Sequence, residues 1–284
     1  MSLSEKISNY ILDMPSFPVS VGKALQVCNS LNINPSDLNH VISLDPVLTG
    51  KLLKLINSAY YGLGTPITSL IKAITMLGLN TVKNLVLSSA VLSNLPGNKG
   101  IDGLNMEGFW HHCLCVGVMT KLLAAKQGIE PKYLEEYFAA GLLHDIGKAP
   151  LNAVLSSEYM QMITVADREH KPLFSIEDEL AGINHCAAGE MIANLWKLDN
   201  PIKDVITYHH RIEEYTGENK NLLCFTAIAD YFSLVYEIGF AGNRKPVKPE
   251  AGIWEAIGLN DDAYLDLMPN LYNEIENAKV FLQI

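Results

Sequence analysis

The stretch "AAGLLHDIGKAP", residues 139–150, joins a run of small and apolar residues to three polar ones. His144 and Asp145 are adjacent, and Lys148 follows three positions later. A carboxylate at the end of an apolar helix is costly to bury unless it is paired or binds a metal. Either the helix ends in water here, or these groups hold a ligand, and the rest of the chain must decide between the two.

The composition is that of a protein with a large buried core, because the 284 residues are 49% hydrophobic and only 18% charged. The formal net charge is −10 and no run of Lys or Arg stands out, so we expect no binding to a nucleic-acid polymer. No apolar run is long enough to span a bilayer, and the N-terminus lacks an apolar signal core, so we expect no membrane association. Five cysteines without a C-x-x-C pair favour a reducing, cytoplasmic compartment.

Apolar residues recur at spacings of three and four along most of the chain, which predicts an all-α fold. The segment "DLNHVISLDPVLTGKLLKLINSAYY", residues 37–61, is typical. Ser36-Asp37 and Asp45-Pro46 have the residues of helix starts, with a hydroxyl or an acid at the N-cap.

Two stretches rich in Gly, Pro and Asn, residues 95–108 and 239–252, predict breaks between helical units. The expected organisation is therefore an N-terminal helical bundle, a linker, a second helical domain and C-terminal helices, at residues 1–95, 96–108, 109–238 and 250–284.

Six of the eight histidines lie in apolar helical stretches of the second domain, namely His111, His112, His144, His185, His209 and His210. Asp145 and Asp230 are acids in similarly apolar surroundings. A single buried His is more often a hydrogen-bonded core residue than a ligand, but six imidazoles and two acids around nothing would be costly to bury. Facing helices can present such groups to one interior point. His with Asp and no thiolate suits Fe, Mn, Zn, Ni or Co.

The doublet His144–Asp145 followed by "IGK" resembles the HD superfamily of divalent-metal phosphohydrolases. The segments "MPSFPVSVGKALQV", residues 14–27, and "SLIKAITMLGLNTVKNLVL", residues 69–87, resemble the HDOD domain, a bacterial variant of the HD fold with an added helical half. The resemblance runs from about residue 12 to about residue 235. It implies an N-terminal helical bundle packed on an HD-type helical domain.

The family's ligand order implies one or two divalent ions at His112, His144, Asp145, His185, His209, His210 and Asp230. His112 is preferred to its neighbour His111, because the family's ligand usually follows Trp by two positions and Trp110 stands there. In an enzyme, Asp145 would bridge two ions. Lys148 would either hold a phosphate oxygen or compensate the dipole at a helix C-terminus, and the sequence favours neither.

The resemblance implies a signal-transduction or regulatory domain with an HD metal site and little or no turnover, because many HDOD proteins have lost ligands. The retained ligand set favours an alternative, a metal-dependent phosphohydrolase or phosphodiesterase acting on a nucleotide or cyclic nucleotide. The Gly-Tyr-Pro segment of the HD-GYP phosphodiesterases is missing after the paired histidines. These two functions imply a signalling protein partner and a small phosphorylated ligand, respectively. A metal-free histidine cluster is the remaining alternative.

Overall fold

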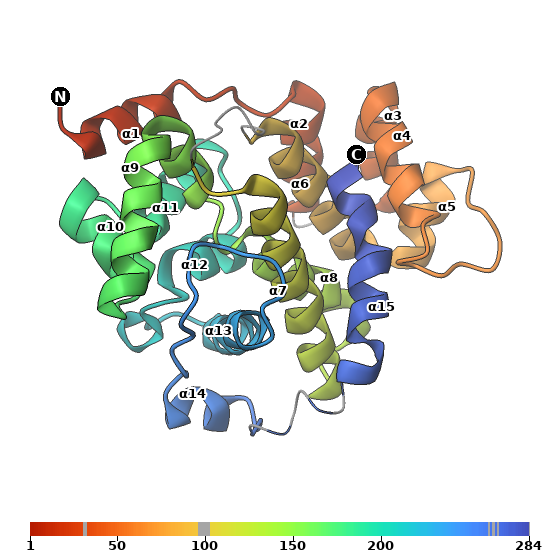
Figure 1. The fold of residues 1–284 in the computed structure, drawn as a ribbon. Coiled ribbons are helices and arrows are strands. Elements are labelled where there is room, and N and C mark those ends of the chain that lie inside the picture. Colours follow the sequence, from red (N-terminus) through yellow and green to blue (C-terminus); the bar gives the residue numbers. More distant parts are fainter. Residues whose placement is uncertain (31–32, 96–102, 261, 263–264, 266, 284) are drawn as a thin grey trace.

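The computed structural model is helical, and no strand occurs among the residues that it describes, so the predicted all-α fold is confirmed. The described residues are 1–30, 33–95, 103–260, 262, 265 and 267–283. Figure 1 shows helices from distant parts of the sequence gathered around α7 and α8.

The first helices of the chain form two separate groups (Figure 1). They are α1 (Leu3–Leu12), α2 (Val19–Cys28), α3 (Pro35–Ser43), α4 (Pro46–Ile56), α5 (Leu70–Leu77) and α6 (Leu79–Asn94). Helices α2 to α6 pack on one another, whereas α1 packs on α9 and α11. Helix α6 also contacts α8, so it joins the N-terminal group to the rest of the molecule.

The central part of the chain surrounds α8. Its elements are α7 (Met106–Lys126), η1 (Pro131–Tyr133), α8 (Leu134–Leu143), α9 (Lys148–Glu169), α10 (Leu173–Ala181), α11 (His185–Leu195), α12 (Asn200–Tyr208), η2 (Ile212–Glu214) and α13 (Lys220–Val235). Helix α8 contacts α6, α7, α12 and α13, and its residues 137–143 are all buried. This position explains why the sequence before His144 is continuously apolar rather than amphipathic.

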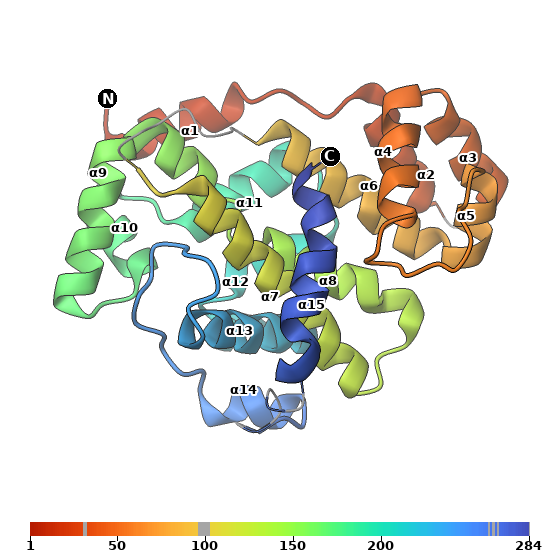
Figure 2. The ribbon, with the colours of Figure 1, turned by 45° about the vertical axis from the view of Figure 1, so that its right-hand side comes forward.

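The C-terminal elements are α14 (Ala251–Ala256), α15 (Met268–Ala278) and η3 (Lys279–Gln283). Helix α15 lies along α7, and η3 contacts α6 (Figure 2). The end of the chain therefore touches both the central and the N-terminal helices. Of the linker predicted at residues 96–108, residues 96–102 lie outside the described part, and α7 already begins at Met106.

One of the two predicted helix starts has the expected cap. Asp45 is the N-cap of α4, and its carboxylate accepts a hydrogen bond from the Leu48 amide at 2.9 Å. For α3 the predicted Ser36 cap is wrong, because the cap is Asn34. Asn34 and Asp37 form a reciprocal capping box around Pro35, whose fixed φ suits the first helical position.

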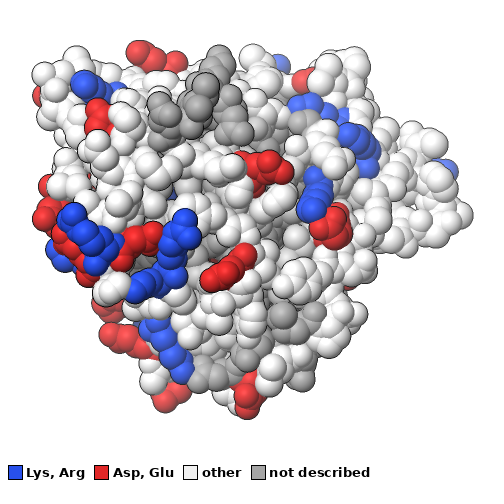
Figure 3. Space-filling model, viewed as in Figure 1, with Lys and Arg blue, Asp and Glu red and all other residues white. Residues whose placement is uncertain are grey.

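Within the described residues, no single helix has both the length and the apolar character needed to cross a membrane. Helices α5 and α6 meet that test only when they are taken together, and they are bent by 116° relative to each other. Gly78 lies at the bend with a φ of 87°, which favours glycine. On the face drawn in Figure 3, Lys and Arg side chains lie among Asp and Glu side chains.

The crossing of α7 and α8 depends on two glycines. A Cβ on Gly141 would lie 2.8 Å from the Gly117 Cα and 2.8 Å from the Val116 carbonyl oxygen. A Cβ on Gly117 would lie 2.9 Å from the Phe138 carbonyl oxygen. These neighbours are backbone atoms of helices, which cannot move aside easily, so the two helices pack at this distance only with glycine on both.

We therefore expect Gly141→Ala to lower the free energy of unfolding by about 1–3 kcal/mol, although alanine is the better helix former. Urea denaturation of the metal-free protein measures this loss.

The matched control is Gly22→Ala in α2, where an added Cβ would meet nothing within 4 Å. This change should stabilise the protein by about 0.4–1 kcal/mol. If both variants have wild-type stability or better, the close helix crossing is not a constraint on the fold.

Candidate metal centre

A group of imidazoles and carboxylates from five helices meets inside the central helices. The Asp145 Oδ2 atom lies 3.3 Å from the His144 Nε2 and 3.8 Å from the His112 Nε2. Asp230 completes this side, because its Oδ1 lies 3.1 Å from the His112 Nε2 and 3.8 Å from the His144 Nε2. We call this set the Oδ2 subsite.

The other oxygen of Asp145 faces a second set of imidazoles. Its Oδ1 lies 3.2 Å from the His185 Nε2 and 3.5 Å from the His209 Nε2. The ligand atom of His210 lies within 4.8 Å of the ligand atoms of these three residues. We call this set the Oδ1 subsite. The structure thus brings all seven predicted metal ligands together, with the Asp145 carboxylate between the two subsites.

Helix ends account for much of this convergence. His144 directly follows α8, His185 is the first residue of α11, and His209 directly follows α12. Because the regular turn of α12 stops at His209, the adjacent His210 also reaches the site, which two neighbours inside a helix could not easily do. Only His112 and Asp230 lie inside helices, α7 and α13.

The turn after Asp145 brings α11 against the doublet. A Cβ on Gly147 would lie 1.9 Å from the His185 carbonyl oxygen and 2.6 Å from the Gly189 nitrogen. No side chain fits there, so Gly147 in the "HDIGK" segment is required for the approach of His185 to Asp145.

The imidazole nitrogens that face Asp145 share an unusual property. The Nε2 atoms of His112, His144, His185, His209 and His210 are buried, and among the described residues none has a hydrogen-bond partner. They lie near carboxylate oxygens, but without hydrogen-bond geometry. Buried polar atoms are nearly always satisfied, and leaving one without a partner costs about 1–3 kcal/mol. Metal ions bound in both subsites, between the Nε2 lone pairs and the carboxylates, would satisfy all five, so the residues present fit such ions.

The opposite ring nitrogens are anchored, which orients the Nε2 atoms. The His144 Nδ1 lies 2.7 Å from the Gly141 carbonyl oxygen, and the His209 Nδ1 lies 2.9 Å from the Val205 carbonyl oxygen. A carbonyl can only accept, so each Nδ1 carries a proton, and whenever the ring is neutral its Nε2 has a free lone pair.

Glu177, which was not predicted from the sequence, is a carboxylate that is completely buried behind His185. Its Oε2 lies 2.6 Å from the His185 Nδ1, and its Oε1 accepts a hydrogen bond from the Tyr159 hydroxyl at 2.6 Å. A signal was present, because Glu177 shares a helix face with Leu173 and Ile176, where an apolar residue is expected.

The charges around Asp145 compensate one another. Burial raises the pKa of the Asp145 carboxyl, but His144 and Lys148 outweigh this effect and hold the pKa well below its usual range. Burial lowers the pKa of the Lys148 ammonium, but Asp145 outweighs it and the pKa lies above its ordinary value. Burial, followed by the neighbouring His209, holds the pKa of His210 well below its ordinary value, so its imidazole is neutral and able to bind a metal.

Lys148 has a position that neither sequence-based interpretation included. It begins α9, its side chain is 1% exposed, and its Nζ donates a hydrogen bond to the Asp145 Oδ2 at 2.6 Å. The Lys148 charge therefore compensates the charge of the buried Asp145 carboxylate.

The other histidines lie outside this centre. His111, the alternative to His112, is partly exposed and belongs to neither subsite. His40 and His170 are exposed.

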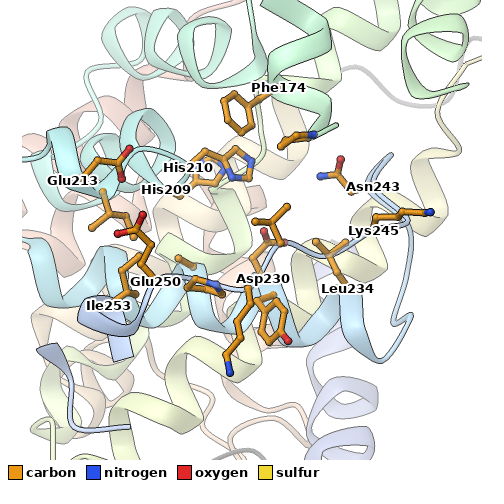
Figure 4. Close-up of a pocket in the computed structure, with 17 residues that line it drawn as sticks. Phe174, His209, His210, Glu213, Asp230, Leu234, Asn243, Lys245, Glu250 and Ile253 are labelled. Atoms are coloured by element: carbon orange, nitrogen blue, oxygen red, sulfur yellow. The ribbon is translucent and has the colours of Figure 1, made fainter. Parts of the chain in front are cut away.

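A cleft of about 270 Å³ reaches the centre from the surface. Its inner end is formed by His209, His210 and Asp230. In Figure 4, Phe174 and His210 lie on one side of the cleft, with Asp230 and Leu234 of α13 on the other. The imidazole of His210 stacks on the Phe174 ring with a centroid distance of 4.8 Å. The cleft is therefore an access route with one apolar, aromatic wall.

Fold and site together define a helical protein with a histidine–aspartate centre suited to divalent metal. The model of the HDOD domain family matches residues 14–212, and the chain belongs to this family. The match includes every imidazole of the centre but ends before Asp230.

Solved structures share this fold. An HDOD domain protein of unknown function from Geobacter sulfurreducens has a TM-score of 0.76 and 24% identity, with coverage of 99% of this chain and 98% of that one. A protein of Shewanella amazonensis SB2B, provisionally named a phosphohydrolase, has a TM-score of 0.72 and 22% identity, with 97% and 98% coverage. A Marinobacter aquaeolei VT8 protein, provisionally named a signal transduction protein, has a TM-score of 0.74 and 18% identity, with 96% and 60% coverage.

Among curated proteins, an uncharacterized protein of Treponema pallidum (strain Nichols) is 23% identical over 231 residues. The aligned region is 80% of this chain but only 44% of that protein, so the chain spans less than half the length of this relative.

The ion pair between Asp145 and Lys148 leads to a stability prediction for the metal-free protein. Asp145→Asn leaves the Lys148 ammonium buried without its charge partner, so we expect a loss of about 3–5 kcal/mol in the free energy of unfolding. The double variant Asp145→Asn/Lys148→Met should recover most of this loss. Urea denaturation in the presence of a chelator measures both, and a double variant no more stable than the single one would contradict the buried pair.

Proposed function

We propose that this protein is a bacterial signal-transduction domain of the HDOD family whose regulatory element is a divalent metal centre with little or no turnover. The observation that carries this proposal is the set of five buried Nε2 atoms that face carboxylates without hydrogen-bond partners among the described residues. Imidazoles and carboxylates without thiolates suit Fe, Mn, Zn, Ni or Co. A reducing cytoplasmic setting belongs to the proposal, and the five cysteines, which are free thiols, support it.

Each of the two subsites would hold one metal ion. His112, His144 and Asp230 would hold one ion with the Asp145 Oδ2, and the three other imidazoles would hold a second ion with the Asp145 Oδ1. Because the ligands come from five helices, binding would fix the positions of those helices relative to one another. Helix α8 contacts α6, so a shift of α8 on metal binding would also move the N-terminal helices.

Two observations support a regulatory role rather than turnover. Lys148 is fully buried and paired with Asp145, so its ammonium is not directed at a ligand in the cleft. The N-terminal helices expose Val19, Leu44 and Val47, which are 73%, 68% and 69% exposed around the start of α4 and suit contact with a signalling protein.

Metal removal tests the proposal. Elemental analysis should find one or two equivalents of a transition metal after supply of Fe, Mn and Zn. Chelation should lower the melting temperature by roughly 5 °C, because saturation at a hundred times the Kd stabilises by about 2.7 kcal/mol.

The variant Asp145→Ala should retain no metal, whereas His40→Ala, a change at an exposed imidazole, should retain the wild-type amount. Wild-type protein with no more metal than Asp145→Ala would contradict the metal centre.

The cleft supports a second candidate, a metal-dependent phosphohydrolase or phosphodiesterase. Ions bound in the centre would polarise a phosphate ester and lower the pKa of a bound water. The chain's own contribution would be to orient the ligand, with His209, His210 and Asp230 at the inner end of the cleft and Phe174 along one wall. The cleft volume of about 270 Å³ lies near the lower end of the range for small-molecule sites, which supports a small phosphorylated ligand for this function.

Assays of the metal-loaded protein separate the two candidates. With bis(p-nitrophenyl) phosphate and a panel of cyclic nucleotides, we expect no turnover above that of Asp145→Ala. Turnover in the wild type that is lost in Asp145→Ala and in Asp230→Asn would instead favour the phosphohydrolase. Equal turnover in all three proteins would indicate a contaminating enzyme.

A further inference from the structure

The imidazoles of the centre differ in what holds their outer nitrogen. The Nδ1 atoms of His144 and His209 face backbone carbonyl oxygens, and the His112 Nδ1 lies 3.1 Å from the Ser233 hydroxyl oxygen. The carbonyl and hydroxyl partners are neutral, and the His209 Nδ1 also lies 4.0 Å from the Cys186 sulfur. The His185 Nδ1 instead lies 2.6 Å from a carboxylate oxygen of Glu177.

The Glu177 carboxylate has three hydrogen-bonding contacts, two with His185 and one with Tyr159. Its Oε2 also accepts a hydrogen bond from the His185 backbone amide at 2.8 Å, and its Oε1 accepts one from the Tyr159 hydroxyl at 2.6 Å. Glu177 and His185 are completely buried, and so is Tyr159. The contacts join α9, α10 and the first residue of α11, so the carboxylate has a single position.

This arrangement has a chemical consequence for His185. A carboxylate that accepts the Nδ1 proton increases electron density on the imidazole, so the Nε2 becomes a stronger ligand with a fixed direction. That Nε2 points at the Asp145 Oδ1, 3.2 Å away. A carbonyl or hydroxyl partner orients its imidazole but adds no negative charge.

The Oδ2 subsite has the opposite charge arrangement. Its extra carboxylate, Asp230, is offset by the Lys148 ammonium, which lies 2.6 Å from the Asp145 Oδ2. A cation bound at Oδ2 would be repelled by this ammonium at short range, where Coulomb interactions inside a protein are strong. Among the described residues, the Asp145 Oδ1 accepts no hydrogen bond, so the ammonium is hydrogen-bonded to Oδ2 alone.

We propose that Glu177 is a positioning residue that makes the Oδ1 subsite the tighter of two unequal metal sites. The ion held by His185, His209 and His210 stays bound under conditions in which the ion of the Oδ2 subsite exchanges. This inference rests on the metal centre of the proposed function. It adds that the two subsites differ in affinity and that a residue outside the ligand set causes the difference.

Titration of the metal-free protein with Zn²⁺ against a fluorescent chelator tests the inference. Wild-type protein should bind two ions in two separate steps. Glu177→Gln keeps the size of the side chain and removes its charge, and should weaken the tight step about 10–100-fold while leaving the weak step unchanged. Tyr159→Phe removes one hydrogen bond to Glu177 and should shift the tight step in the same direction by less.

Two control variants separate positioning from general disturbance. Glu179→Gln removes a charge from the same helix at a side chain that is 59% exposed, and should change neither step. Ser233→Ala removes the Nδ1 partner of His112 and should affect only the weak step. The visible absorption of bound Co²⁺ should change in Glu177→Gln for the first equivalent added and not for the second.

The outcomes separate the inference about Glu177 from the proposed metal centre. Two steps that weaken equally in Glu177→Gln, or a tight step unchanged in both Glu177→Gln and Tyr159→Phe, would overturn the inference and leave the metal centre standing. Two ions of equal affinity in the wild type would do the same. Wild-type protein that binds no Zn²⁺ would overturn both the inference and the proposed function.

Discussion

The buried carboxylate of Asp145 is the constraint on which the rest of the structure depends. A carboxylate that is 1% exposed needs compensating charge, and it has an ammonium on one oxygen and imidazoles around both. Its surroundings require close backbone packing, which Gly147 permits toward α11 and the Gly117–Gly141 crossing permits between α7 and α8. The fold therefore serves to hold polar groups together in a core that would otherwise exclude them.

The all-α fold could be predicted from the sequence, because apolar residues recur at helical spacings. The seven candidate ligands came from the resemblance, because apolar surroundings alone would also select His111. The grouping around Asp145 also follows once a family order is available. Glu177 was not predicted, because "SIEDELAG" reads as an exposed acidic helix unless its apolar face is traced. The role of Lys148 was left open for a different reason, since spacing places a side chain on a helix but does not identify its partner. The Asn34 cap was missed although Asn34-Pro35 has the same pattern as Asp45-Pro46, because the hydroxyl of Ser36 was preferred as the cap.

The two candidate functions share one centre and differ in what the surrounding residues do. A regulatory domain needs ligands that tie helices together, and ligands from five helices meet that need. An enzyme needs a metal centre that a substrate can reach, and His210 and Asp230 at the inner end of the cleft provide this access. The buried ion pair of Lys148 favours the first, because it keeps the cation away from the cleft. Unequal subsites would be compatible with either function, since a retained ion can orient the ligands of an exchangeable one.

Anomalous X-ray scattering at a metal absorption edge, from crystals grown with a divalent transition metal, tests the central claim most directly. The account predicts a peak at bonding distance, about 2.0–2.3 Å, from the Asp145 carboxylate and from imidazole Nε2 atoms of at least one subsite. Crystals that bind the metal only at exposed imidazoles such as His40 and His170, with no peak beside Asp145, would contradict it.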